Sequence, residues 1–126
     1  MGPDFFELER KEPFAATLKR VEDAITGAGM VIFARIDHAA GAREAGLSMP
    51  PTIVLLYGNP KGGTPMMLAS PRAALDLPLR VLVREENGRA IVAFHPVVET
   101  LTRAGVPAEL AAKLEPAQHL IVNTIK

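Results

Sequence analysis

The sequence contains no cysteine. The chain therefore has no disulfide bonds, no thiolate nucleophile and no cysteine ligands for zinc or an iron–sulfur cluster. It also lacks an excess of charge, because 14 lysine and arginine residues balance 14 aspartate and glutamate residues. Proteins that bind nucleic acids usually carry a basic excess, and those that bind membrane surfaces carry a basic stripe. We therefore expect no nucleic acid and no membrane among the partners.

Long apolar runs are missing as well. The longest is far shorter than the roughly 20 residues needed to span a bilayer. The first ten residues have neither the basic start nor the apolar centre of a signal peptide. These observations predict a soluble, cytoplasmic protein. The sequence also contains no Gly-x-Ser-x-Gly elbow and no dinucleotide fingerprint, so it identifies no cofactor.

The residues that are present suffice for one globular domain. Of the 126 residues, 48% are apolar, which is enough for an ordinary core. We see no internal repeat, low-complexity segment or interdomain linker. The sequence therefore predicts a single domain over residues 1–126.

Apolar periodicity and turn residues predict an α+β fold in the order β-α-β-α-β-α-β-β-α. The clearest helix has Pro13 as its first residue and is ended by Gly27 and Gly29. Asn87-Gly88 is typical of a tight hairpin between two strands. We expect one mostly antiparallel sheet of four to five strands with helices packed on it. Strands are expected at 5–9, 30–36, 52–57 (central), 79–85 and 90–94, and further helices at 38–45, 64–69, 97–103 and from 107.

Asp37 and His38 form the first candidate site. If Asp37 caps a helix, His38 is its first residue, where the helix dipole disfavours imidazolium. We would then expect a neutral His38 with a lowered pKa, able to accept or donate a proton. The alternative is structural: a capping aspartate next to a histidine whose hydrogen bonds are satisfied by backbone.

The loop from Gly58 to Pro65 is the second candidate. It is not a Walker A sequence, because Lys61 precedes the glycine pair. Thr64 and Pro65 resemble a cap and the first residue of a helix. Free N–H groups at such a helix end could bind an anion, with Lys61 adding charge. The alternative is an ordinary turn whose glycines supply positive φ angles. The candidate ligand-binding residues of this loop are Asn59, Lys61, Gly62, Gly63 and Thr64.

Asp76 is the third candidate, because a carboxylate among leucines is expected to be buried and to need a partner. Arg35, Lys61 or His38 could serve, and the residue could equally brace a turn. His95 and His119 lack the spacing of a helical metal pair. We therefore predict no metal site.

Several short sequence motifs, taken together, are similar to those of one known family. They include Ile36-Asp37-His38-Ala39-Ala40, Tyr57-Gly58-Asn59-Pro60, Gly63-Thr64-Pro65-Met66-Met67 and Asp76-Leu77-Pro78-Leu79. The chain resembles the domain of unknown function 302 family over roughly residues 10 to 100. The resemblance implies a TATA-binding-protein-like fold, with a curved antiparallel sheet flanked by helices, and a homodimer. A fold by itself implies no DNA binding.

Three functional hypotheses follow. The first is a homodimer that binds a small molecule or anion through Asp37, His38, Asn59, Lys61, Gly62, Gly63, Thr64 and Asp76. The second is an enzyme that uses His38 as general acid or base, oriented by Asp76 or Asp37. The third is a non-catalytic interaction module that acts through its surface.

Overall fold

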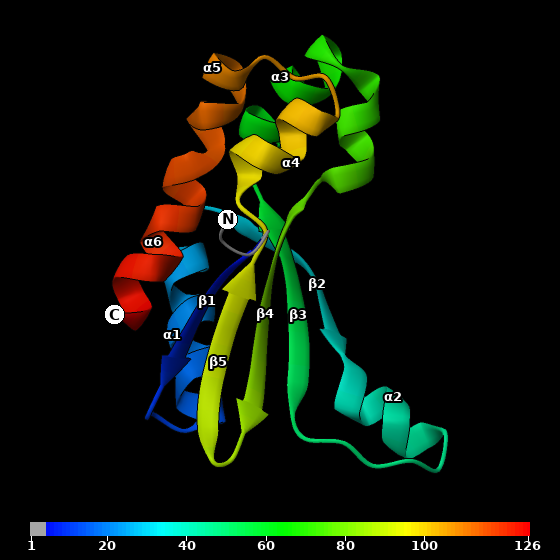
Figure 1. Cartoon of the computed structure of the whole chain (residues 1–126), viewed down its shortest axis with the longest axis vertical. Coiled ribbons are helices and arrows are strands. Elements are labelled where there is room, and N and C mark those ends of the chain that lie inside the picture. Colours follow the sequence, from blue (N-terminus) through cyan, green and yellow to red (C-terminus); the bar gives the residue numbers. More distant parts are fainter. Residues whose placement is uncertain (1–4) are drawn as a thin grey trace.

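The computed structural model describes residues 5–126, and these form an α+β fold (Figure 1). Residues 1–4 lie outside the described residues. They are part of the predicted domain of 1–126 and of the N-terminal segment that lacks the features of a signal peptide. One five-stranded sheet has the order β1-β5-β4-β3-β2, and every neighbouring pair is antiparallel. The strands are β1 (Phe6–Arg10), β2 (Val31–Asp37), β3 (Thr52–Gly58), β4 (Leu79–Glu86) and β5 (Arg89–Phe94).

The predicted hairpin is confirmed. Glu86 pairs with Arg89 across the turn, and both turn residues have positive φ, 52° at Asn87 and 76° at Gly88. This is the conformation that a two-residue hairpin turn requires and that asparagine and glycine tolerate. The prediction that residues 52–57 form the central strand is wrong, because β4 is central and β3 is second from the edge.

Six α-helices and two short 3-10 helices connect and flank the strands of the described chain. The helices are α1 (Phe14–Gly27), α2 (His38–Glu44), α3 (Pro60–Ala69), α4 (Val97–Arg103), α5 (Ala108–Ala111) and α6 (Glu115–Ile125). The 3-10 helices are η1 (Pro71–Asp76) and η2 (Ala112–Leu114). None of the helices among residues 5–126 has both the length and the apolar character needed to cross a bilayer.

Two predicted helix starts are wrong, and one helical segment was not foreseen. Pro13 is the residue before α1 rather than its first residue. The third helix begins at Pro60, four residues before the predicted start at Thr64, because Asn59 caps it. The η1 turn at residues 71–76 has no apolar periodicity that would have revealed it.

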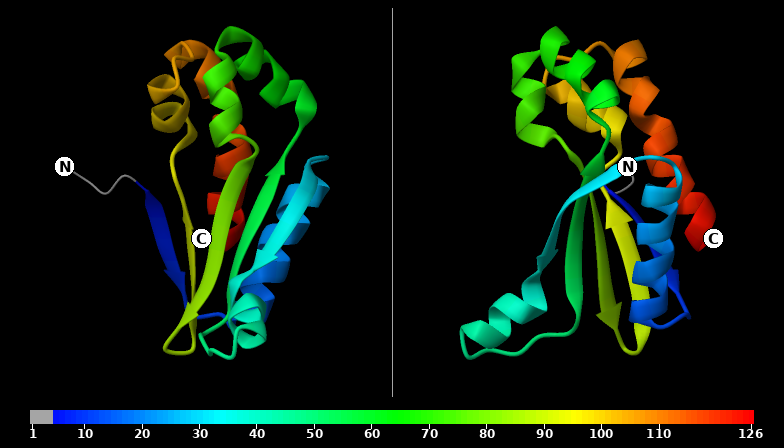
Figure 2. Two further views of the ribbon diagram at one scale, coloured as in Figure 1. Left: turned by 90° about the vertical axis from the view of Figure 1, so that its right-hand side faces the viewer. Right: turned by 180° about the vertical axis from the view of Figure 1, so that it is seen from behind.

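One face of the sheet is covered by helices, and the other is not. Figure 2 shows α1 and α6 side by side over the same face. Figure 1 looks onto the opposite face, over which no helix of the described chain lies between α2 and the upper helices. The helix α2 projects from the lower end of the sheet, away from the other helices. We call these surfaces the covered face and the open face.

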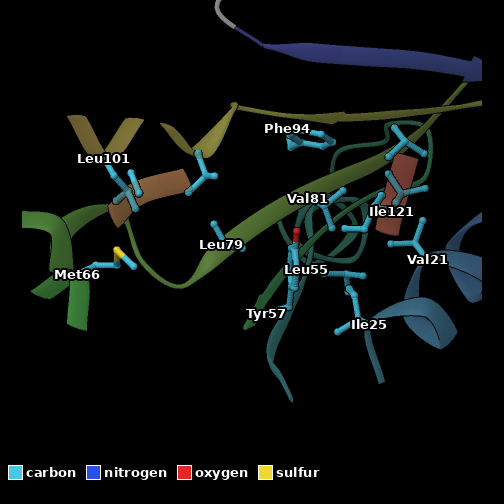
Figure 3. Close-up of a cluster of buried hydrophobic side chains, with 14 of the residues drawn as sticks. Val21, Ile25, Leu55, Tyr57, Met66, Leu79, Val81, Phe94, Leu101 and Ile121 are labelled. Atoms are coloured by element: carbon cyan, nitrogen blue, oxygen red, sulfur yellow. The ribbon is translucent and has the colours of Figure 1, made fainter. Parts of the chain in front are cut away.

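The core lies between the covered face and its helices (Figure 3). Leu55 and Val81 point from neighbouring strands toward Val21 and Ile25 of α1, and Ile121 of α6 closes the cluster. These five side chains are fully buried. Their burial is what fixes both helices on the sheet, since burying a large aliphatic side chain contributes about 1.5–3 kcal/mol.

Candidate functional site

The two segments predicted to form one site lie at opposite ends of β2 and β3. In the antiparallel register Asp37 is opposite Ile53, whereas Gly58 is opposite Val31. Ile53 and Gly58 are five residues apart along β3, which corresponds to about 17 Å. Within one chain, therefore, a single site cannot contain both Asp37-His38 and the Gly58–Pro65 loop.

Asp37 has the predicted structural role. Its carboxylate oxygen accepts a hydrogen bond of 2.9 Å from the Ala40 N–H and caps α2. His38 is the first residue of α2, directly after β2, and its side chain is exposed to solvent. His38 and Asp76 lie near opposite ends of the sheet, so Asp76 cannot orient the His38 imidazole.

The backbone N–H groups at the start of α3 are already used by the chain itself. Pro60 has no N–H, and the Lys61 N–H donates to the Asn59 side chain over 2.9 Å. The N–H groups of Gly62 and Gly63 donate to the Asn59 carbonyl oxygen over 2.8 and 3.0 Å. A helix end binds an anion through unsatisfied N–H groups, and these are satisfied. The geometry therefore does not favour the predicted backbone anion site.

Close packing against η2 explains why residue 62 is a glycine. A Cβ atom built at Gly62 would lie 3.1 Å from the Leu114 side chain of η2, which is tighter than an ordinary van der Waals contact. The missing side chain lets α3 approach η2. Gly62 therefore serves the contact of these two helical segments.

An apolar pocket of about 360 Å³ lies beside this contact. Four of the predicted residues line it: Asn59, Gly62, Gly63 and Thr64. Lys61, Asp76, Asp37 and His38 are not among its lining residues. The remaining lining residues, mostly apolar, are Met30, Phe33, Tyr57, Gly58, Pro60, Met67, Leu77, Pro78, Leu79, Lys113, Leu114 and Ala117.

Tyr57 and Lys113 contribute polar groups to the pocket, and the sequence did not predict either of them as a site residue. The Tyr57 side chain is fully buried, and its hydroxyl donates to the Ala117 carbonyl oxygen over 3.2 Å. Burial raises the pKa of the Tyr57 phenol, since the anion would be desolvated, so the phenol stays neutral. Lys113 lies on η2 and is exposed, so it brings one positive charge to the pocket. Only the tertiary structure brings η2 to the end of β3.

Asp76 lies elsewhere, in a polar cleft of about 470 Å³. It is the last residue of η1 and is half-buried, whereas the neighbouring Leu75 is 82% exposed. The expected partners are absent from this cleft, and Arg35 instead pairs with Glu22 of α1. The lining residues are Leu75, Asp76, Leu79, Arg80, His95, Val97, Thr100 and Gln118.

Metal ligands do not gather in the described part of the chain. Over residues 5–126 there is no group of three or more histidine, aspartate or glutamate side chains suited to hold a metal ion.

The fold and these pockets define a small α+β protein with an antiparallel sheet, an uncovered sheet face and an apolar pocket at one sheet end. The chain belongs to the family described as Domain of unknown function DUF302, whose model matches residues 6–125. The fold matches the crystal structure of an uncharacterized conserved DUF302 protein from Bacillus stearothermophilus, with a TM-score of 0.88 and 17% identity. That alignment covers 99% of this chain and 100% of the other. The family and the α+β fold predicted from the sequence are thus confirmed.

Curated relatives match over a shorter stretch. The chain is 43% identical over 80 residues to the fluoride-specific ion channel FluC 1 of Brucella suis biovar 1 (strain 1330), covering 64% of this chain and 32% of that protein. It is equally similar to FluC 2 of Brucella melitensis biotype 1, covering 64% and 30%. The chain thus spans about a third of the length of these relatives.

Proposed function

We propose that this protein binds a small, mostly apolar molecule that carries one acidic group, and that it does so as a homodimer. The observation that carries the proposal is the apolar pocket beside the start of α3. Its volume of about 360 Å³ lies within the range of pockets that hold small molecules. Such pockets are lined mainly by apolar side chains, with a few polar groups that orient the ligand.

Two features of the pocket favour an acidic amphiphile over a phosphate. The N–H groups of Lys61, Gly62 and Gly63 at the start of α3 are bonded to Asn59, so this helix end offers none of the three to an oxyanion. The positive charge comes from Lys113 instead, an exposed side chain whose ammonium group could meet a carboxylate near solvent. The apolar part of the ligand would then contact side chains such as Met67 and Leu77.

The open face supports the homodimer. Val54, Leu56 and Leu82 are only half-buried there, and Ile36 is 42% exposed. The loop after α2 adds Leu47 and Met49, which are 68% and 41% exposed. Partly exposed apolar side chains on this sheet face and on the projecting segment suit a self-complementary interface between two copies.

The pocket is tested by thermal unfolding with sodium octanoate, with 1-octanol as the uncharged probe. A ligand at ten times its Kd stabilises a protein by about 1.4 kcal/mol, or roughly 5 °C in Tm for a chain of this size. We expect such a shift with octanoate and a smaller one with octanol. Sodium fluoride and sodium phosphate are included as inorganic anions, fluoride because the curated relatives are named for it.

Two exposed lysines provide a matched pair of variants. Lys113→Gln should weaken octanoate binding about tenfold and leave octanol binding unchanged, because only the charge is lost. Lys61→Gln should change neither, since Lys61 does not line the pocket. No stabilisation by octanoate, or equal loss in both variants, would overturn the apolar-acid proposal. A shift with fluoride or phosphate alone would also overturn it, in favour of an inorganic anion.

A further inference from the structure

The polar cleft lies where β4 and β5 separate. Their paired residues end at Leu82 opposite Ala93, although β4 begins at Leu79 and β5 extends to Phe94. Figure 2 shows the two strands diverging as they run toward η1 and α4. Continued in the same register, Arg80 would be opposite His95 on the open face. Arg80 and His95 both line the cleft at this point.

Charged and polar groups from separate elements line this gap. Asp76 comes from η1, Arg80 from β4, His95 from the residue after β5, and Thr100 from α4. Among residues 5–126, neither the Asp76 carboxylate nor the Arg80 guanidinium takes part in a hydrogen bond or ion pair. Two opposite charges therefore line one cleft without pairing with each other, which leaves both able to bind a third molecule.

The wall of the cleft is held in place by Gln118. This side chain is 5% exposed, and it accepts a hydrogen bond from the Val97 N–H over 2.9 Å while donating to the His95 carbonyl oxygen over 2.8 Å. Thr100 donates its hydroxyl to the Pro96 carbonyl oxygen over 3.1 Å, so its lone pairs remain to accept a donor. The turn that carries His95 is thereby fixed relative to α6, and a rigid wall favours a defined site.

We propose that this cleft is a second binding site, which takes a small carboxylic acid that also carries an amino or hydroxyl group. The Arg80 guanidinium can donate two parallel hydrogen bonds to the two oxygens of a carboxylate. The Asp76 carboxylate and the Thr100 hydroxyl accept hydrogen bonds from the amino or hydroxyl group. The volume of about 470 Å³ suits a ligand of this size. The site is distinct from the apolar pocket, because within residues 5–126 the two linings share Leu79 alone.

Titration with L-serine, followed by backbone amide chemical shifts, tests the proposal. Propionate is the probe that lacks the second polar group. We expect L-serine to shift amides of residues 76–80 and 95–100, and propionate to bind about tenfold more weakly. Arg80→Gln should weaken the binding of both probes at least tenfold, and Asp76→Asn that of L-serine alone. Arg103→Gln, an exposed arginine of α4 outside the cleft, should change neither.

Three results would overturn the proposal. The first is the absence of shifts at residues 76–80 and 95–100 with L-serine. The second is L-serine binding that survives Arg80→Gln. The third is equal affinity for propionate and L-serine. Shifts confined to the residues of the apolar pocket would assign the ligand to that pocket instead, so the two sites are separable in one experiment. Thermal unfolding of each variant establishes that it is folded.

Discussion

At β3 the two faces of the sheet are similar in apolar character and different in cover. Along β3 the residues of the covered face, Ile53, Leu55 and Tyr57, are at most 7% exposed. Those of the open face, Thr52, Val54 and Leu56, are half-buried. In a sheet that meets water on one face, apolar and polar residues normally alternate. Here burial alternates along β3 while apolar character does not, and this pattern supports the homodimer proposed above.

The largest difference between the faces should appear in two consecutive residues. Leu55→Ala leaves a cavity between the sheet and the helices α1 and α6, and should lower the free energy of unfolding by about 2–5 kcal/mol. Val54→Ala removes methyl groups from a half-buried position, and should cost less than about 1 kcal/mol in the monomer. Urea unfolding at low protein concentration measures both. Equal costs would mean that the open face is as fully packed as the core.

A second comparison concerns association rather than stability. Leu82→Glu places a carboxylate on the open face between Arg80 and Arg84, which share its side of β4, so the folded monomer should tolerate it. In a homodimer that uses this face the same charge would be buried. We therefore expect the Kd of dimer dissociation to rise at least tenfold. Analytical ultracentrifugation measures it. Leu68→Glu, at an 81% exposed position on α3, is the control. A wild-type monomer, or a dimer unaffected by Leu82→Glu, would contradict this interface.

The smallest effects should come from ion pairs. Glu12, before α1, accepts hydrogen bonds from Arg20, Thr17 and Arg10, and the bond from Arg20 is the main cause that lowers its pKa to about 2. A lowered pKa in the folded state means that Glu12 stabilises the protein above its unfolded pKa, near 4.5, and that this contribution is lost as the pH falls toward 2.

Glu12→Gln should therefore lower the urea midpoint at pH 7 and have a much smaller effect near pH 2. Glu9→Gln breaks the pair between Glu9 and Arg89 on the open-face side, whose side chains are about half exposed. We expect almost no change at either pH, because exposed ion pairs contribute little. A Glu12→Gln effect that persists unchanged at pH 2 would contradict the role assigned to this carboxylate.

Local signals in the sequence predicted the elements well where the signal is itself local. The Asn87-Gly88 hairpin and the Asp37 cap depend on a few neighbouring residues, and both are present in the structure. The start of α3 was misplaced because two caps compete within six residues. Asn59 and Thr64 are both good caps followed by proline, and the Asn59 side chain is the one that binds a backbone N–H.

The candidate site could be predicted only in part. Asn59, Gly62, Gly63 and Thr64 do line a pocket, but its apolar walls come from four other segments of the chain, and its cation from η2. Asp76 lines a cleft, and its neighbours there are Arg80 and His95 rather than His38. The prediction grouped Asp37, His38 and the Gly58–Pro65 loop because they are close in the sequence. The antiparallel pairing of β2 with β3 instead places them at opposite ends of these two strands.

The sequence by itself determined the class of fold, the family, the hairpin and the absence of thiol chemistry, because each depends on composition or on short stretches of chain. The tertiary structure alone decided which face of the sheet is left open, which side chains share a pocket and which N–H groups remain available. These features depend on strand order, register and packing between segments that are far apart in the sequence. Short local patterns of residues do not show which distant segments will lie next to each other.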